Sequence, residues 1–235
     1  MATFPFSAPS RAATPDWETR LIAGGMDEKA ITLGLHVKLA KGWKTYWRVP
    51  GEAGIPPQIK LDSPEIVAIN ILYPLPSRLI DDSGEALGYH DEVVFIVKPT
   101  INPALKHGRP QGKLSAFFGV CEKICKPVKF EAELSSAVLD DRLLDKYLEQ
   151  VPKQGKVATK AEHTTAGLEL TLTQGFEDIF VDGPEGVYFR KPVFDGRLAR
   201  LKIDGLQEGR KLSGEQLRLT ASTKGKGLEQ AVTVT

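Results

Sequence analysis

Cys121 and Cys125 are the residues of this chain whose type and spacing suggest chemistry. They are the only two cysteines in 235 residues. Both lie where one predicted β-strand turns into the next, and the three residues between them form a common hairpin loop. Directly opposed residues in such a pair have Cβ atoms about 4.5–5.5 Å apart, close to the roughly 3.5–4.5 Å of a disulfide. The spacing therefore predicts a bridge that can open and close, and redox chemistry is the first hypothesis.

The second strand of this hairpin is expected to place Cys125 on a polar face. Cys125 alternates with Lys129 and Glu131, whereas Val128 and Phe130 point to the other side. A bridge that closes so short a loop removes little entropy from the unfolded chain, so it is a poor structural staple. Exposed bridges are also the labile ones. The alternatives are an incidental hairpin disulfide and two thiols without a role.

Length and composition fit one large or two small soluble domains. The hydrophobic share of 41% and the charged share of 26% are ordinary for a globular protein. A net charge of +1 gives no electrostatic case for nucleic acid. No apolar run approaches the roughly 18–20 residues of a spanning helix. The N-terminus lacks the features of a signal peptide, so we expect either a cytosolic protein or the processed form of a secreted one.

Short alternating runs broken by Gly and Pro predict an all-β fold. After a loose leader at residues 1–16, seven strands over residues 17–138 favour a β-sandwich. They are expected at Trp17–Gly24, Ala30–Lys38, Gln58–Asp62, Ile66–Tyr73, Glu92–Lys98, Gly112–Val120 and Lys126–Leu134. Apolar residues at helical spacing predict a linker helix within residues 139–153. Residues 154–235 are expected to form a second, smaller all-β domain.

Two further segments could line or cover a site. The cluster Gly42–Arg48 holds large aromatics that can form a docking surface or wall a reactive site. Core packing is the plainer interpretation of Trp43 and Trp47. The segment Tyr73–Glu92 is predicted to be a long irregular loop, which is typical of lids and binding segments.

Metal and cofactor chemistry is weakly supported. The four histidines are scattered, and none forms a pair with ligand spacing on one element. Two cysteines with one nearby histidine could still hold a soft ion such as Cu(I). Hydrolase and phosphate-binding motifs are absent from the sequence. No resident metal or cofactor is expected.

Several segments together resemble a known family. They are Gly42–Arg48 with Pro50–Pro57, Gly88–Phe95 and Val120–Pro127, in that order. They are similar to the N-terminal periplasmic region of the DsbD-type thiol–disulfide interchange proteins, in particular the ScsB-like branch associated with copper tolerance. The resemblance implies an immunoglobulin-like β-sandwich in the periplasm. It also implies a cysteine pair that takes electrons from a membrane-embedded thiol reductase domain and passes them to thioredoxin-like proteins.

The same resemblance assigns site residues. Cys121 and Cys125 take the redox role, and Tyr46 lies among aromatics near them, with Trp47 beside it. The loop over the pair corresponds to a shielding cap. Its expected members are Asp81, Asp82, Leu87 and Tyr89. The chain departs from the best-known members in its shorter cysteine spacing and in a cap with one clear aromatic.

Lys126 adjoins Cys125, and a nearby cation stabilises a thiolate, so we expect Cys125 to be the attacking thiol. Neither nucleic-acid binding nor membrane insertion by the chain itself is expected. Two alternatives remain open: a copper-binding module related to copper tolerance, and a protein-binding β-sandwich whose disulfide is only structural.

Overall fold

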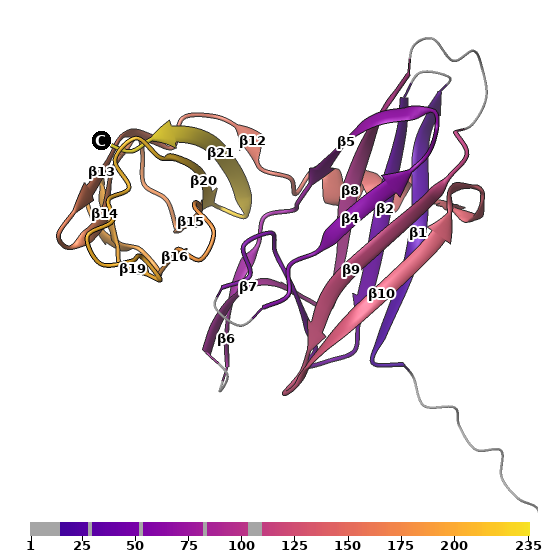
Figure 1. Ribbon diagram of the computed structural model, residues 1–235, viewed down its shortest axis with the longest axis horizontal. Helices are drawn as coiled ribbons and strands as arrows, with labels where there is room; N and C mark the ends of the chain where they lie inside the picture. The colour runs from indigo at the N-terminus through magenta and orange to yellow at the C-terminus, as the bar shows by residue number, and fades with distance from the viewer. Residues whose placement is uncertain (1–14, 28–29, 52–53, 82–83, 103–109) are drawn as a thin grey trace, which may run out of the picture.

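The computed structural model describes residues 15–27, 30–51, 54–81, 84–102 and 110–235. Within these ranges the chain forms two β-sheet units that lie side by side (Figure 1). Nearly all regular structure is β, so the all-β prediction is confirmed. Of the expected leader at residues 1–16, all but the last two residues lie outside the described ranges.

The first unit is a β-sandwich of two sheets. One sheet has the order β11-β1-β2-β8-β5, and the other has the order β10-β9-β3-β7-β6, with β4 also paired to β9. The strands are β1 Trp17–Asp27, β2 Ala30–Leu39, β3 Lys44–Tyr46, β4 Gln58–Asp62, β5 Ile66–Leu72, β6 Ser77–Asp81, β7 Gly84–His90, β8 Glu92–Ile101, β9 Lys113–Cys121, β10 Cys125–Glu133 and β11 Val138–Leu139. All seven strands predicted for this unit are present, with ends shifted by a few residues.

Alternation along the strands decides which side chains enter the core. On β9, Leu114, Phe118 and Val120 are fully buried between the sheets. Successive side chains of a strand point to opposite faces, so Gly119 and Cys121 lie on the outer face of the same sheet. The cysteines therefore sit outside the main core.

The segment Tyr73–Glu92 is not the irregular loop that the sequence suggested. It forms the hairpin of β6 and β7, and β7 pairs in turn with β3. The partner strand β3 lies about 40 residues before β7 in the sequence, so no local sequence pattern could predict this pairing. The hairpin extends the cysteine-bearing sheet toward the second unit (Figure 1).

The predicted helix is present as α1, Asp141–Leu148. Asp140 caps it by accepting a hydrogen bond from the backbone N–H of Leu143 at 3.1 Å. Leu144 and Tyr147 are buried in the core of the first unit. The helix therefore packs on the first sandwich before the chain crosses to the second unit.

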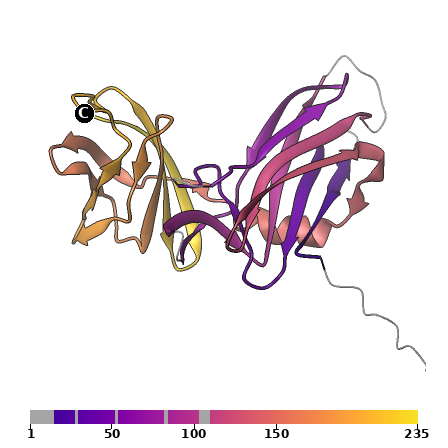
Figure 2. The same cartoon turned by 60° about the horizontal axis from the view of Figure 1, so that its bottom comes forward.

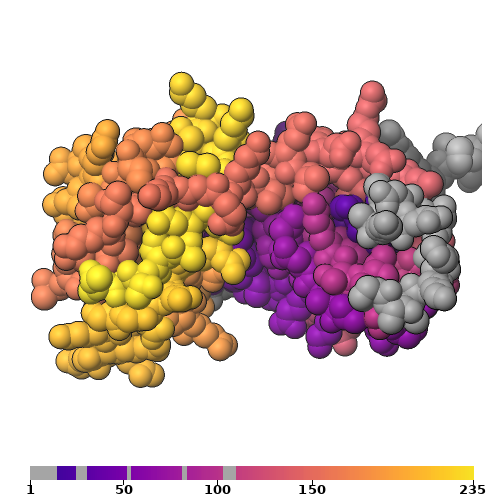
Figure 3. Space-filling view, turned by 90° about the horizontal axis from the view of Figure 1, so that it is seen from above, coloured from indigo at the N-terminus to yellow at the C-terminus, as the bar shows by residue number. Residues whose placement is uncertain are grey.

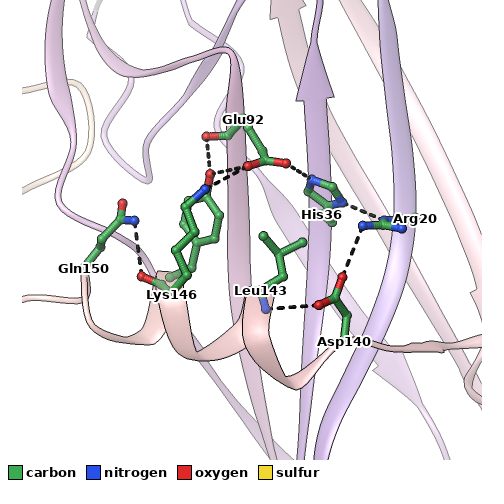
Figure 4. A network of polar contacts seen from close by, with 8 residues as sticks. Arg20, His36, Glu92, Asp140, Leu143, Lys146 and Gln150 are labelled. Carbon is green, nitrogen blue, oxygen red and sulfur yellow. Dashed lines mark hydrogen bonds and ion pairs between the residues drawn. The ribbon is translucent and has the colours of Figure 1, made fainter.

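A chain of polar contacts ties α1 to the outer face of β1, β2 and β8 (Figure 4). Arg20 Nε donates to His36 Nδ1 at 2.7 Å, and His36 Nε2 lies 2.8 Å from Glu92 Oε1. Glu92 also accepts from Lys146 Nζ and the Tyr147 hydroxyl. Burial lowers the pKa of His36 more than the neighbouring Glu92 raises it. The neutral ring suits this network, because Nδ1 must accept from Arg20.

The second unit is a smaller sandwich of two four-stranded sheets, ordered β12-β21-β20-β15 and β13-β14-β18-β17, with a two-stranded ribbon of β16 and β19. Its strands are β12 Lys153–Gln154, β13 Ala158–Thr164, β14 Gly167–Leu172, β15 Asp178–Asp182, β16 Tyr188–Phe189, β17 Val193–Asp195, β18 Leu198–Leu201, β19 Ile203–Asp204, β20 Gln216–Thr223 and β21 Lys226–Thr233. It has a hydrophobic core of its own. The residue boundaries predicted for the domains stay a prediction.

The two units touch through the β6–β7 side of the first and the β15-β20-β21 sheet of the second (Figure 2). Seen from above, the two units meet in the middle of the molecule, and the chain crosses from one to the other there (Figure 3). Phe180 of β15 is buried within the core of the first unit. The contact is therefore a packed interface with apolar and charged components.

Candidate redox site

Cys121 ends β9 and Cys125 begins β10, so the two residues face each other across the hairpin. The register pairs Cys121 directly with Cys125, as the loop length predicted. Both are free thiols. The turn between them carries Ile124, whose side chain is 78% exposed. Formation of a bridge needs only a small inward adjustment of the two directly opposed residues.

The two sulfurs differ in exposure. Cys121 is 1% exposed, whereas Cys125 is half-buried. The hydroxyl of Tyr46 lies 2.9 Å from Cys125 Sγ, and Tyr46 is itself only 2% exposed. The prediction that Cys125 occupies a solvent-facing polar surface is therefore wrong in part, since Tyr46 covers that end of the outer face. An incoming reagent meets Cys125 before it meets Cys121.

Tyr46 is held in place by close packing against glycines. A Cβ added at Gly54 would lie 2.6 Å from Tyr46 Cδ1 and 2.3 Å from Pro50 Cβ. A Cβ at Gly119 would lie 3.1 Å from Tyr46 Cε2 and 2.9 Å from Ile55 Cβ. Only a residue without a side chain lets the backbone approach the ring so closely. The described part of the Pro50–Pro57 segment therefore covers the outer face beside the cysteines.

The electrostatics of the pair distinguish its two thiols. Burial and a hydrogen bond with Cys125 raise the pKa of Cys121, while a hydrogen bond with Tyr46 and the charge of Lys44 act in the opposite direction. Lys44 pairs directly with Cys121 in the neighbouring strand and is 3% exposed. Burial raises the pKa of Tyr46, so its hydroxyl stays protonated and can donate to a sulfur. Lys44 was not among the predicted residues, although it belongs to the aromatic cluster at residues 42–48.

Lys126 does not provide the cation expected beside Cys125. Its Nζ lies 3.2 Å from Asp16 Oδ2 and sits 4.7 Å from the ring centroid of Trp43 and 5.5 Å from that of Trp17. Neighbouring residues of a strand point to opposite faces, so the side chain of Lys126, which directly follows Cys125, points away from it. The buried cation next to the pair is Lys44.

The predicted cap is contradicted at Leu87 and Tyr89. Leu87 and Tyr89 are buried in the core of the first unit, where the Tyr89 ring contacts Phe95. Their positions on β7 point to the face opposite the cysteines. Asp81 ends β6, and Asp82 lies outside the described residues.

Trp47 does not line the cysteine site either. Its side chain is fully buried, and its ring lies 6.0 Å from that of Phe180 in the second unit. The sequence could flag the aromatic cluster but could not reveal which partner each ring would meet. Tyr46 turns to the cysteines, and Trp47 turns to the interface.

Other site types find little support in the described residues. Among them, no group of three or more His, Cys, Asp and Glu side chains could hold a metal ion. A cavity of about 380 Å³ lies between the two units, with Arg48, Tyr73, Arg218 and Glu229 among its lining residues, and the cysteines are not part of it. In the same described ranges, no helix has both the length and the apolar character needed to cross a membrane.

Comparison with known proteins identifies the family. Residues 13–136 match the model described as "Thiol:disulfide interchange protein DsbD, N-terminal". No curated protein matches the chain. The N-terminal periplasmic domain of ScsB from Proteus mirabilis is similar in structure, with a TM-score of 0.73 and 20% identity, covering 97% of this chain and 96% of that chain. The N-terminal domain of DsbD from Neisseria meningitidis in the reduced form has a TM-score of 0.30 and 17% identity, covering 49% of this chain and 82% of that chain.

A β-sandwich with two facing thiols at one hairpin is suited to thiol–disulfide exchange. The chain belongs to the family of DsbD N-terminal domains, because the family model covers more than half of it. The predicted resemblance is confirmed, and the likeness to the ScsB domain shows that the fold extends over both units. Family membership supports thiol–disulfide interchange as the chemistry of this protein.

Proposed function

We propose that the protein relays electrons through its Cys121–Cys125 pair, from a membrane-embedded thiol reductase domain to thioredoxin-like proteins of the periplasm. The observation that carries the proposal is the pair itself, with directly opposed sulfurs of unequal exposure beside a tyrosine hydroxyl. The periplasmic location follows the description of the similar ScsB domain. Disulfides persist in that compartment, as such a relay requires.

The reduced pair passes electrons on in two displacements. Cys125, as a thiolate, attacks one sulfur of the acceptor's disulfide, so a mixed disulfide forms and one acceptor thiolate leaves. The Cys121 thiol then loses its proton and attacks Cys125 Sγ. This step closes the Cys121–Cys125 bridge and releases the second acceptor thiolate, so two electrons have moved to the acceptor. A donor dithiol restores the reduced pair by the same steps in reverse.

Exposure favours Cys125 as the sulfur that meets the partner. Cys121 is buried, and burial raises its pKa, so it starts as a thiol. The buried Lys44 opposite Cys121 favours its thiolate at the second step. The exposure of the two sulfurs and the charges around them thus support an outer attacking sulfur, Cys125, and an inner resolving sulfur, Cys121.

A redox titration tests the relay. The protein is equilibrated with buffers of defined potential and then mixed with a thioredoxin-like protein. We expect a reduction potential between about −300 and −120 mV, within reach of thioredoxin-like partners, and exchange with such a partner. A potential well below about −300 mV without exchange would identify a structural bridge instead.

Single cysteine variants test the assignment of roles. The partner is a thioredoxin-like protein with one active-site cysteine replaced by serine and the other activated with thionitrobenzoate. Cys121→Ser, which keeps Cys125, is expected to form the mixed disulfide readily, and Cys125→Ser is expected to form little. Complex formation by Cys125→Ser alone would reverse the assignment.

A further inference from the structure

Three consecutive residues connect the cysteine pair to the second unit. Tyr46 places its hydroxyl 2.9 Å from Cys125 Sγ. Trp47 follows and packs edge-on against Phe180 of the second unit, with ring centroids 6.0 Å apart. Arg48 comes next and forms ion pairs with the second unit. The redox site and the interface therefore share one short segment of chain.

Arg48 is the centre of the polar part of this interface. Its Nε donates to Asp182 Oδ2 at 2.9 Å, and its Nη2 donates to Glu229 Oε2 at 2.7 Å and to Thr220 Oγ1 at 3.2 Å. The guanidinium carbon lies 4.2 Å from the centroid of the Trp47 ring. Charge-assisted hydrogen bonds to two carboxylates define both the position and the orientation of a planar guanidinium.

A second arginine holds the same two surfaces together. Arg78 of β6 donates from Nε to Asp178 Oδ2 at 2.7 Å and from Nη2 to the carbonyl of Ile179 at 2.9 Å. It also pairs with Glu85 of its own hairpin and lies over the Phe180 ring, 5.2 Å from its centroid. Phe180 is thereby enclosed between the arginine and the indole of the first unit.

At Tyr46, strand β3 is paired on one side only. β3 pairs with β7 through Tyr46, but its pairing with β9 includes only Lys44 and Thr45. Beyond Tyr46 the backbone keeps the hydrogen bond from Trp47 N–H to the carbonyl of Leu87 at 2.9 Å. A strand end that is paired on one side has fewer backbone hydrogen bonds to fix it, so the contacts of Trp47 and Arg48 contribute to its position along with the packing of the Tyr46 ring.

We propose that the second unit is a positioning element of the redox site, and that Arg48 of the first unit and Phe180 of the second are the positioning residues. By holding Arg48 and Trp47, the second unit keeps the Tyr46 hydroxyl against Cys125. The hydroxyl then stabilises the reduced form of Cys125, the more accessible of the two sulfurs. This inference rests on the proposed function, because it concerns the reactivity of the same pair.

The test compares interface variants with Tyr46→Phe, which removes the hydroxyl alone. The variants are Arg48→Gln and the double variant Asp182→Asn/Glu229→Gln. The matched control is Arg200→Gln, because Arg200 forms its ion pairs with Glu169 and Asp195 inside the second unit. Circular dichroism first establishes that each variant is folded. Two quantities are then measured on the full chain: the reduction potential, and the rate at which iodoacetamide alkylates Cys125 in the reduced protein.

Tyr46→Phe is expected to change the alkylation rate by roughly three- to tenfold, as the loss of one hydrogen bond implies. Both interface variants should shift the alkylation rate and the reduction potential in the same direction as Tyr46→Phe does, and Arg200→Gln should leave both unchanged. Adding Arg48→Gln to Tyr46→Phe should produce no further shift, because both changes act through one contact. Additive shifts, or wild-type values in folded interface variants or in Tyr46→Phe, would overturn the proposal.

The two proposals fail in distinguishable ways. Alkylation and potential are measured without any partner protein, so they report on the positioning of Tyr46 alone. Exchange with a thioredoxin-like protein is measured separately on the wild type. Absence of that exchange counts against the relay. The alkylation rates and potentials of the variants would still test whether the second unit positions Tyr46.

Discussion

Replacement of Phe180 by Ala should separate the two units and weaken the first. Phe180 belongs to β15 of the second unit, yet its side chain is 3% exposed and packs in the core of the first unit. The variant removes the ring from between Trp47 and Arg78. The variant should therefore lower the stability of the first unit, although Phe180 belongs to the second.

The expected loss is large relative to the stability of a domain. Truncation of a buried Phe to Ala costs about 3–5 kcal/mol, against a net stability of about 5–15 kcal/mol. With a urea dependence of about 2 kcal/mol per molar, a loss of about 4 kcal/mol lowers the unfolding midpoint by about 2 M. Such a shift is far outside the error of a denaturation curve.

The tryptophans make the assay specific to the first unit. The chain has three, and Trp17, Trp43 and Trp47 all lie in that unit. Their fluorescence reports unfolding of the first unit, while far-ultraviolet circular dichroism reports both units. For Phe180→Ala we expect a lower fluorescence midpoint, loss of coincidence between the two signals, and a changed native emission from Trp47.

Phe176→Ala is the matched control. Phe176 is buried in the second unit's own core, so its truncation has the same chemistry without the contact to Trp47. It should lower the stability of the second unit and leave the native tryptophan emission unchanged. If Phe180→Ala keeps the wild-type emission and fluorescence midpoint, the packed interface described above is refuted.

Three further changes probe the rest of the molecule. Gly54→Ala should destabilise the protein by about 1–3 kcal/mol in urea and alter alkylation of the cysteines as Tyr46→Phe does, because the new methyl would overlap the Tyr46 ring; wild-type behaviour would contradict this packing. Leu87→Ala should lower the free energy of unfolding by about 2–5 kcal/mol, because Leu87 lies in the core, but it should not change the rate at which dithiothreitol reduces the oxidised protein. Faster reduction of the folded variant would mean that Leu87 shields the cysteines after all. Because the pKa of His36 is lowered in the folded protein, the unfolded chain binds the imidazole proton more tightly than the folded chain does. The contribution of the neutral His36 to stability is therefore present above about pH 6.5 and is lost as the pH falls through the folded-state pKa. The urea midpoint should therefore fall more between pH 7 and pH 5 in the wild type than in His36→Gln. An equal fall in the two proteins would count against a network built on the neutral His36 ring.

Local patterns were sufficient for much of the fold. Strand alternation predicted seven strands of the first unit, and the 3.6-residue spacing predicted α1. The loop length between Cys121 and Cys125 predicted their pairing, because a short hairpin loop sets the register of its own strands. These features depend on residues that are close together in the chain.

The surroundings of the cysteines depended on the tertiary structure. Tyr46 and Lys44 reach the pair because β3 pairs beside β9, and Leu87 and Tyr89 leave it because β7 turns their side chains into the core. Lys126 is next to Cys125 in sequence and still points away from it.

The amino-acid sequence by itself indicated the candidate redox residues of this protein, their opposition in a hairpin and the all-β class. The tertiary structure alone decided which sulfur is reachable, which side chains touch it and how the second unit joins the segment that carries Tyr46. The physical reason is that side chains on one face of a sheet come from neighbouring strands, and the pairing of distant strands is set by burial of the whole core.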